Sequence, residues 1–136
     1  MYKRQVICYE SIYGEYCTRY IQKGANAIFI GTNDGWWDDT MGHRQHLLFA
    51  RLRAIETRRS IARSANSGVS AFINQRGDIL QATTYETEAA IKGNIQMNDE
   101  ITFYTIWGDL IARIALFTTI LLFLNTFVKG FTSQKK

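Results

Sequence analysis

The segment of this sequence best suited to chemistry is Cys8-Tyr9-Glu10, a thiol followed by a carboxylate. The apolar residues before it predict a short β-strand over residues 5–10. Residues 11–23 predict a helix that ends at Gly24. A thiol at the point where a strand turns into a helix lies close to the amide dipoles of the helix N-terminus, which favour the thiolate. Cys8 is therefore a candidate nucleophile.

A second group of candidate residues follows the next predicted strand, 27–30. The loop 32–40 contains Asn33, Asp34, Trp36 and Trp37. Ligands of open α/β sheets bind at the carboxyl ends of the strands, and Cys8 is expected at that same edge. We therefore take these four residues as candidates for a substrate-binding loop that faces the cysteine. The alternative is that one tryptophan closes the top of the core.

A basic helix is predicted over residues 43–59, where apolar side chains repeat at helical spacing. Its five arginines could bind phosphate groups or anionic lipid, but a solvated face with internal ion pairs is the commoner arrangement, and we expect that. Glu56 is the lone acid in this helix, and we expect it to pair with an arginine. His43 and His46 have a spacing that can ligate a metal, but no third ligand is evident nearby. We expect no metal.

The rest of the chain predicts more strands. Residues 60–66 predict one strand, residues 69–74 and 79–82 a hairpin, and residues 89–97 a last strand with alternating apolar positions. The length of 136 residues suits one domain with a core, and two cysteines are too few for a disulfide framework. Cys17 lies on the apolar side of the first helix and is expected in that core. The net charge of +4 reflects mainly the arginine helix, so we predict no nucleic-acid partner.

The end of the chain predicts a membrane span. Residues 114–128 carry no charge, and extension back to residue 110 adds only Arg113. A membrane helix needs about 20 mostly apolar residues, so the segment is long enough if Arg113 reaches the interface. Trp107 precedes it, and Lys129, Lys135 and Lys136 follow it. We predict a domain over 1–108, a transmembrane helix over 109–129 and a short basic cytoplasmic tail over 130–136. The alternative is a buried C-terminal core helix.

Several segments carry a resemblance to a known family. They occur in this order: Ile7-Cys8-Tyr9-Glu10, Thr32-Asn33-Asp34-Gly35-Trp36, Gln45-His46-Leu47, Arg53-Ala54-Ile55-Glu56-Thr57 and Arg63-Ser64-Ala65-Asn66-Ser67-Gly68. With Trp107-Gly108-Asp109 and the terminal span, they resemble the C-terminal part of the apolipoprotein N-acyltransferases, a membrane-bound branch of the nitrilase (carbon-nitrogen hydrolase) superfamily. The resemblance runs from about Val6 to the span.

This resemblance implies a partial nitrilase-like α-β-β-α sandwich, an α/β fold, followed by one C-terminal transmembrane helix. It implies transfer of an acyl chain from a membrane phospholipid to the N-terminal cysteine amine of an apolipoprotein, without a cofactor. Cys8 matches the nucleophile, Tyr9 and Glu10 match active-site positions, and Glu56 matches a structural support. The implied location is the bacterial inner membrane, with the catalytic part periplasmic and the C-terminus cytoplasmic.

The resemblance also implies two catalytic residues that have no match in this chain. The family's glutamate base and catalytic lysine precede the nucleophile by many residues, whereas seven residues precede Cys8 here. We therefore expect this chain to be the C-terminal portion of a longer enzyme, inactive by itself, with the missing N-terminal portion as a partner. Two alternatives are an amidase of the nitrilase type and a non-catalytic, membrane-tethered remnant.

Overall fold

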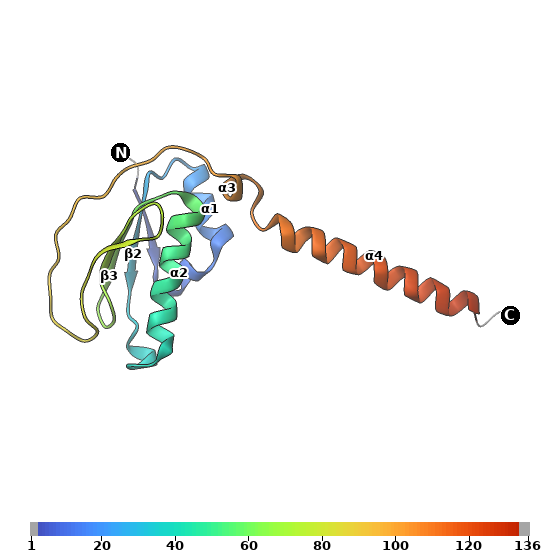
Figure 1. Ribbon diagram of the computed structural model, residues 1–136, viewed down its shortest axis with the longest axis horizontal. Helices are drawn as coiled ribbons and strands as arrows, with labels where there is room; N and C mark the ends of the chain where they lie inside the picture. Colours follow the sequence, from blue (N-terminus) through green and yellow to red (C-terminus); the bar gives the residue numbers. More distant parts are fainter. Residues whose placement is uncertain (1–2, 134–136) are drawn as a thin grey trace.

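The protein, seen here in a computed structural model that describes residues 3–133, is built on a five-stranded mixed sheet (Figure 1). The strands lie in chain order: β1 (Lys3–Ile7), β2 (Ala27–Thr32), β3 (Ile61–Ala65), β4 (Ala71–Ile73) and β5 (Ile79–Ala82). β1, β2 and β3 are parallel, and β4 and β5 continue the sheet as an antiparallel pair. The predicted hairpin over 69–82 is thus confirmed.

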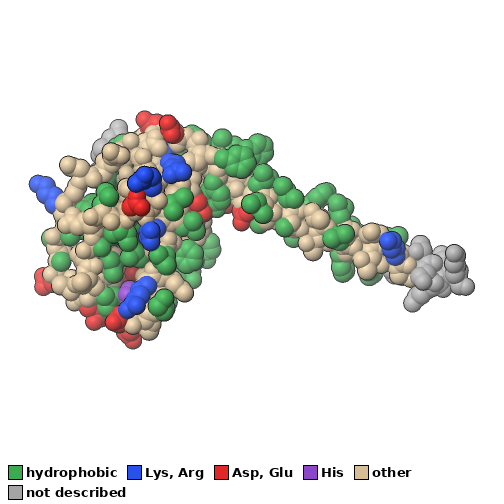
Figure 2. Space-filling view, in the orientation of Figure 1, with side chains coloured by type: hydrophobic (Ala, Val, Ile, Leu, Met, Phe, Trp, Pro, Cys, Tyr) green, Lys and Arg blue, Asp and Glu red, His purple; other side chains and the backbone are tan. Residues whose placement is uncertain are grey.

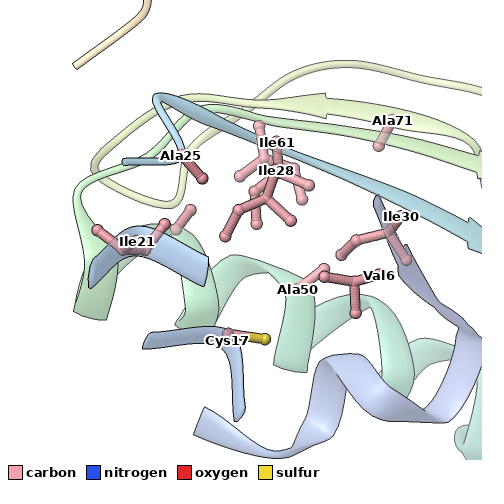
Figure 3. Close-up of a cluster of buried hydrophobic side chains, with 11 residues drawn as sticks. Val6, Cys17, Ile21, Ala25, Ile28, Ile30, Ala50, Ile61 and Ala71 are labelled. Atoms are coloured by element: carbon pink, nitrogen blue, oxygen red, sulfur yellow. The ribbon is translucent and has the colours of Figure 1, made fainter. Parts of the chain in front are cut away.

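Two helices form the crossovers between the parallel strands. α1 (Gly14–Gln22) joins β1 to β2, and α2 (Met41–Thr57) joins β2 to β3. Figure 3 shows the core between these helices and the sheet, where isoleucines of the strands face Cys17 and Ile21 of α1 and Ala50 of α2. Small side chains such as Ala50 let α2 lie close to the sheet. Cys17 is 1% exposed, which confirms its predicted place in the core.

The first strand ends earlier than predicted. β1 stops at Ile7, and a short 3-10 helix, η1 (Cys8–Ile12), follows it. The reason is local, because the Glu10 carboxylate accepts a hydrogen bond from the backbone N–H of Ile7 at 2.8 Å and closes a turn. The extended backbone therefore stops one residue before the cysteine.

The predicted strand over residues 89–97 is wrong. The segment 83–102 contains no regular secondary structure and runs around the outside of the domain from β5 to α3 (Figure 1). It packs on a face of the sheet, where the Cα of Gly93 lies so close to the Phe72 ring that an added Cβ would be 3.0 Å from it. Apolar alternation predicts a strand only where a neighbouring strand accepts its hydrogen bonds, and this segment lies over the sheet instead.

The chain ends in a long helix that projects from the domain. α3 (Phe103–Trp107) is followed by α4 (Leu110–Ser133), which extends away from the sheet (Figure 1). Over Leu110–Gly130, 21 residues are long and apolar enough to cross a membrane, and none of that stretch is buried inside the protein. Figure 2 shows hydrophobic side chains along this helix. The alternative of a buried core helix is therefore wrong, while residues 134–136 of the predicted tail lie outside the described residues.

Candidate active site

The candidate nucleophile occupies a strained turn between β1 and η1. Cys8 has a φ of +47°, in the left-handed region that residues other than glycine seldom adopt. Hydrogen bonds hold this turn on both sides of the cysteine. Glu10 accepts from Ile7 N–H, and the Ser11 hydroxyl donates to the carbonyl oxygen of Cys8 at 2.8 Å. Such strain persists only where the surroundings impose it, and it turns the thiol toward the carboxyl edge of the sheet.

The thiol of Cys8 lies beside the end of β2. Ile7 is paired in register with Gly31, so the residue after each strand lies at the same edge. The Thr32 hydroxyl donates to Sγ at 3.4 Å, and Sγ is 3.9 Å from the carbonyl oxygen of Asn33. The loop after β2 therefore contacts the cysteine, as its position in the sequence predicts. Cys8 itself is half-buried.

The four loop candidates have different surroundings. Trp36 is 85% exposed, and the Asn33 side chain accepts from Gly35 N–H within the loop. Trp37 is half-buried, stacks on Tyr9 at 6.2 Å between ring centroids, and meets the His46 ring edge-on at 5.4 Å. Asp34 is fully buried. Trp37 and Tyr9 thus form an aromatic pair next to the turn at Cys8, whereas the Asp34 carboxylate points into the protein.

Asp34 is the centre of a buried ionic cluster. One carboxylate oxygen lies 2.8 Å from His46 Nδ1 and the other 2.5 Å from Arg63 Nη2, and all three side chains are nearly inaccessible to solvent. Burial by itself would raise the pKa of Asp34, but hydrogen bonds from His46 and Arg63, with the charge of Arg63, lower that pKa to about 2. A buried carboxylate with charged donors on both oxygens has a structural role. Here it joins the loop after β2 to α2 and β3.

The other nitrogen of His46 faces the nucleophile's turn. Nε2 lies 3.0 Å from Ser11 Oγ and 3.2 Å from the carbonyl oxygen of Cys8. Ser11, His46 and Asp34 thus follow the order of a Ser-His-Asp triad. Ser11 is 1% exposed and its hydroxyl donates to the Cys8 carbonyl, so it is not placed to attack a substrate. The Cys8 thiol beside this cluster is half-buried.

Two partners occupy the carboxylate of Glu10. Besides Ile7 N–H, it accepts from the Tyr16 hydroxyl at 3.0 Å, and Tyr16 in turn accepts from Tyr20 at 2.6 Å. Hydrogen bonds with Tyr20 and then with Glu10 raise the pKa of Tyr16 above its ordinary value. In this arrangement Glu10 stabilises the turn that carries Cys8.

The sequence matches a known protein family over most of its length. Residues 5–103 match the family model described as carbon-nitrogen hydrolase. The chain belongs to this family. It is 36% identical to the apolipoprotein N-acyltransferase of Chlorobaculum tepidum over 82% of this chain and 21% of that protein, and 38% identical to that of Bdellovibrio bacteriovorus over 75% and 19%. The resemblance predicted from the motifs is confirmed, and the chain spans about one fifth of the length of these curated relatives.

Solved structures show the same fold. A carbon-nitrogen hydrolase of Helicobacter pylori matches with a TM-score of 0.55 and 16% identity, over 63% of this chain and 37% of that one. A nitrilase-superfamily protein of Saccharomyces cerevisiae matches with a TM-score of 0.54 and 22% identity, over 63% and 34%. The predicted fold class, a partial nitrilase-like domain followed by one apolar helix, is confirmed.

In this carbon-nitrogen hydrolase domain, Glu56 pairs with an arginine as predicted. Arg53 Nη2 donates to one Glu56 carboxylate oxygen at 3.1 Å, and Nε lies 3.0 Å from the other as an ion pair. Burial raises the pKa of Glu56, and the charge of Arg53 partly opposes that shift. Arg53 Nη1 also donates to the carbonyl oxygen of Ile12 at 3.0 Å, at the far end of η1. The pair therefore ties α2 to the helical turn that begins at Cys8.

The arginines of the predicted basic helix, residues 43–59, are more buried than predicted. Arg53 and Arg59 are 4% and 1% exposed, and Arg51 donates to the carbonyl oxygen of Gly77. Arg44 and Arg58 are exposed. The expected solvated face is thus wrong for Arg53 and Arg59, because the backbone carbonyls of Ile12, Ala25 and Glu100 accept their hydrogen bonds. Within the described part of the chain, no group of three or more His, Cys, Asp or Glu residues is placed to hold a metal.

Sequence reasoning missed the role of the buried cluster. His46 and Arg63 fell inside the family-like motifs, yet nothing in their spacing linked them to Cys8. A weak signal was available, since His46 stands on the same helical face as the small core residues Ala50 and Ala54. A histidine on a buried helix face needs polar partners, and Asp34 was one of the carboxylates predicted at the edge of the sheet.

We expect Gly68→Ala to destabilise the site more than a matched glycine variant. Gly68 has a φ of +120°, and an added Cβ would lie 2.7 Å from Asp34 Oδ2. Gly24 has a φ of +88°, with nothing within 4 Å of its added Cβ. Both variants incur backbone strain of roughly 1–2 kcal/mol, and Gly68→Ala must also displace the buried carboxylate, for a total of about 3 kcal/mol or more. Thermal unfolding in detergent measures both, and equal losses would contradict this account of the Asp34 pocket.

Proposed function

We propose that this chain supplies the acyl-carrying cysteine of an apolipoprotein N-acyltransferase. The observation that carries the proposal is the strained turn at Cys8, which presents a half-buried thiol at the start of a helical turn and at the carboxyl edge of the sheet. The curated relatives named apolipoprotein N-acyltransferase support the choice of reaction. A membrane phospholipid is the proposed acyl donor, and the N-terminal amine of an apolipoprotein is the proposed acceptor.

The proposed reaction has two steps. The Cys8 thiolate attacks the ester carbonyl carbon of the phospholipid, a C–S bond forms, and the C–O bond breaks to release a lysophospholipid alkoxide that takes up the thiol's proton. The acceptor amine then attacks the thioester, the C–S bond breaks, and the amine's proton returns to sulfur. Covalent catalysis replaces one difficult transfer with two easier ones. The backbone N–H of Tyr9 is the proposed donor to the oxyanion of each tetrahedral intermediate.

The proton carrier for these steps is proposed to come from another part of the enzyme. Within the described residues, the hydrogen-bond contacts of the Cys8 thiol are the Thr32 hydroxyl and the Asn33 carbonyl, and neither accepts a proton near neutral pH. The Glu10 carboxylate binds Ile7 N–H and Tyr16. The glutamate and lysine implied by the resemblance would therefore be contributed by an N-terminal portion of the same enzyme. This chain by itself is then inactive.

The test is an acyl-transfer assay with phospholipid vesicles and a lipoprotein-derived peptide that begins with cysteine. The chain is assayed alone and together with the preceding portion of a curated relative, expressed as a separate polypeptide. We expect transfer only in the mixture. Turnover by the chain alone would show that the base lies within it, and no turnover in any mixture would count against the acyltransferase itself.

We further propose that α4 anchors the domain in the bacterial inner membrane with the catalytic part in the periplasm. The support is the uncovered apolar helix, with the half-exposed Trp107 before it and Lys129 near its end. At the domain end, Arg113 pairs with Glu15 at 2.8 Å, which keeps this charge at the surface.

We expect the full chain to remain in the membrane fraction after an alkaline carbonate wash and Leu121→Lys to weaken that retention. A lysine near the centre of a membrane helix costs about 2.5–3.5 kcal/mol. Leu80→Lys is the matched control, because it places the same charge on an exposed leucine of β5 and should not change retention. Protease added outside spheroplasts should digest the domain. Release of the unmodified chain by the wash would favour the amidase alternative, because that activity does not require a membrane helix.

A further inference from the structure

His46 makes two hydrogen-bond contacts that point in opposite directions. Nδ1 lies 2.8 Å from the Asp34 carboxylate, and Nε2 lies 3.2 Å from the carbonyl oxygen of Cys8. The ring is 2% exposed, so it does not touch a substrate. His46 comes from α2, whereas Cys8 begins η1 and Asp34 follows β2. The imidazole is therefore a bridge between a buried carboxylate and the backbone of the nucleophile.

The chemistry of these partners decides where the ring carries protons. A carboxylate with a pKa of about 2 only accepts hydrogen bonds, so Nδ1 donates to Asp34. A carbonyl oxygen also only accepts, so Nε2 donates toward Cys8. Ser11 does not change this count, because its hydroxyl proton is directed to the same carbonyl at 2.8 Å and its oxygen is left to accept from Nε2. A ring that donates through both nitrogens is an imidazolium.

We infer that His46 is a positioning residue for Cys8: as an imidazolium held by Asp34, it binds the Cys8 carbonyl and keeps the nucleophile in its left-handed conformation. This inference rests on the proposed function only in taking Cys8 as the nucleophile. Two donors, His46 and Ser11, then converge on one carbonyl oxygen, at the residue whose φ is +47°. Each helps to offset the backbone strain that the turn requires.

Two charged side chains face His46, and they act in opposite directions on its charge. Asp34 faces it from the loop after β2, and Arg63 Nη2 of β3 lies 3.4 Å from Nδ1. The rings of Tyr9 and Trp37 cover it from η1 and η2 (Gly35–Trp37). The Asp34 carboxylate lies between the two cations and binds both, which makes the cluster singly positive.

The first test uses the unmodified chain in detergent micelles. The sequence has two histidines, so ¹⁵N labelling of histidine gives two rings to follow, and His43→Gln assigns them. We expect both nitrogens of His46 to carry protons at about pH 7.5, above the ordinary pKa of a free imidazole. A His46 ring with one bare nitrogen at that pH would overturn the inference without any variant of the site.

The second test compares His46→Gln with His43→Gln through alkylation of Cys8 by iodoacetamide. His43 is a matched control: it is 3% exposed on the same helix, its Nδ1 is 3.1 Å from the Asp38 carbonyl, and it stacks on Tyr85. Cys17, 1% exposed in the core, reports folding, because it is alkylated only when the domain opens. Peptide mass spectrometry separates the two cysteines.

We expect His46→Gln to change the alkylation rate of Cys8 by about tenfold, the factor expected for one charge-assisted hydrogen bond, while Cys17 stays protected. His43→Gln should stay within about twofold, the scatter expected for a substitution away from the site. An alkylation rate of Cys8 that stays within about twofold in His46→Gln, with Cys17 still protected, would overturn the inference.

Two outcomes separate this inference from the proposed function. If His46→Gln exposes Cys17, the variant has unfolded, and the ¹⁵N measurement on the unmodified chain decides alone. If the ring is doubly protonated and controls Cys8 alkylation while no mixture transfers acyl chains, the positioning role stands and the acyltransferase proposal fails. If acyl transfer occurs and His46→Gln leaves both alkylation and transfer unchanged, the positioning role fails by itself.

Discussion

Cys8→Ala abolishes acyl transfer and the thioester intermediate, the largest effect that we expect from a single substitution. Loss of a covalent nucleophile lowers the rate by on the order of a millionfold, which places the variant below detection. The acyl group on the unmodified chain should be released by hydroxylamine, as a thioester is. Labelled phospholipid, gel electrophoresis and peptide mapping measure both the amount of acyl label and its position in the reconstituted enzyme.

Cys17→Ala is the control for this experiment, because it removes the other cysteine from the core of the same domain. Burial raises the pKa of Cys17 to about 11, so this thiol is almost entirely protonated near neutral pH. Iodoacetamide should therefore label Cys8 well before Cys17 in the folded chain. Acyl label that survives Cys8→Ala, or faster labelling of Cys17, would disprove the assignment of Cys8.

Arg63→Met should cost about 3–5 kcal/mol of folding free energy, the loss expected when one partner of a buried ion pair is removed. Its guanidinium lies 2.5 Å from Asp34 and also donates to the carbonyl oxygen of Val69. Methionine leaves the Asp34 carboxylate buried with one charged partner fewer. Urea unfolding of the chain in detergent, followed by circular dichroism, measures the loss.

Arg113→Met is the matched control, since it breaks an ion pair of similar length with Glu15 at the surface. The side chains of that pair are 60% and 46% exposed, so the expected loss is within about 1 kcal/mol. The double variant Asp34→Asn/Arg63→Met should recover part of the stability, because no unpaired carboxylate remains. Equal losses in the two arginine variants would contradict a structural role for the buried cluster.

Several features of this protein could be predicted because they depend on neighbouring residues. The strand before Cys8, the two crossover helices, the hairpin and the apolar C-terminal helix all follow from local periodicity and turn residues. The placement of Cys8 beside the loop after β2 also followed, because parallel strands end at one edge of a sheet. The sequence alone is enough to predict these features.

Other features required the fold. The apolar alternation of residues 89–97 predicted a strand, but β5 is paired with β4 and the segment lies over the sheet. Glu10 was predicted at the active site, and only the turn shows that its carboxylate binds Ile7 N–H and Tyr16. The direction of a side chain depends on which backbone and side-chain partners surround it. A one-dimensional pattern does not contain those partners.

The sequence by itself determined that a thiol would stand where a strand meets a helix, in a carbon-nitrogen hydrolase domain that precedes an apolar helix. The tertiary structure decided how that thiol is held. Asp34, His46 and Arg63 come from a loop, a helix and a strand, and they meet only because the sheet and α2 bring them together. Burial then gives their charges the strength to fix the backbone of Cys8, since solvent no longer screens them.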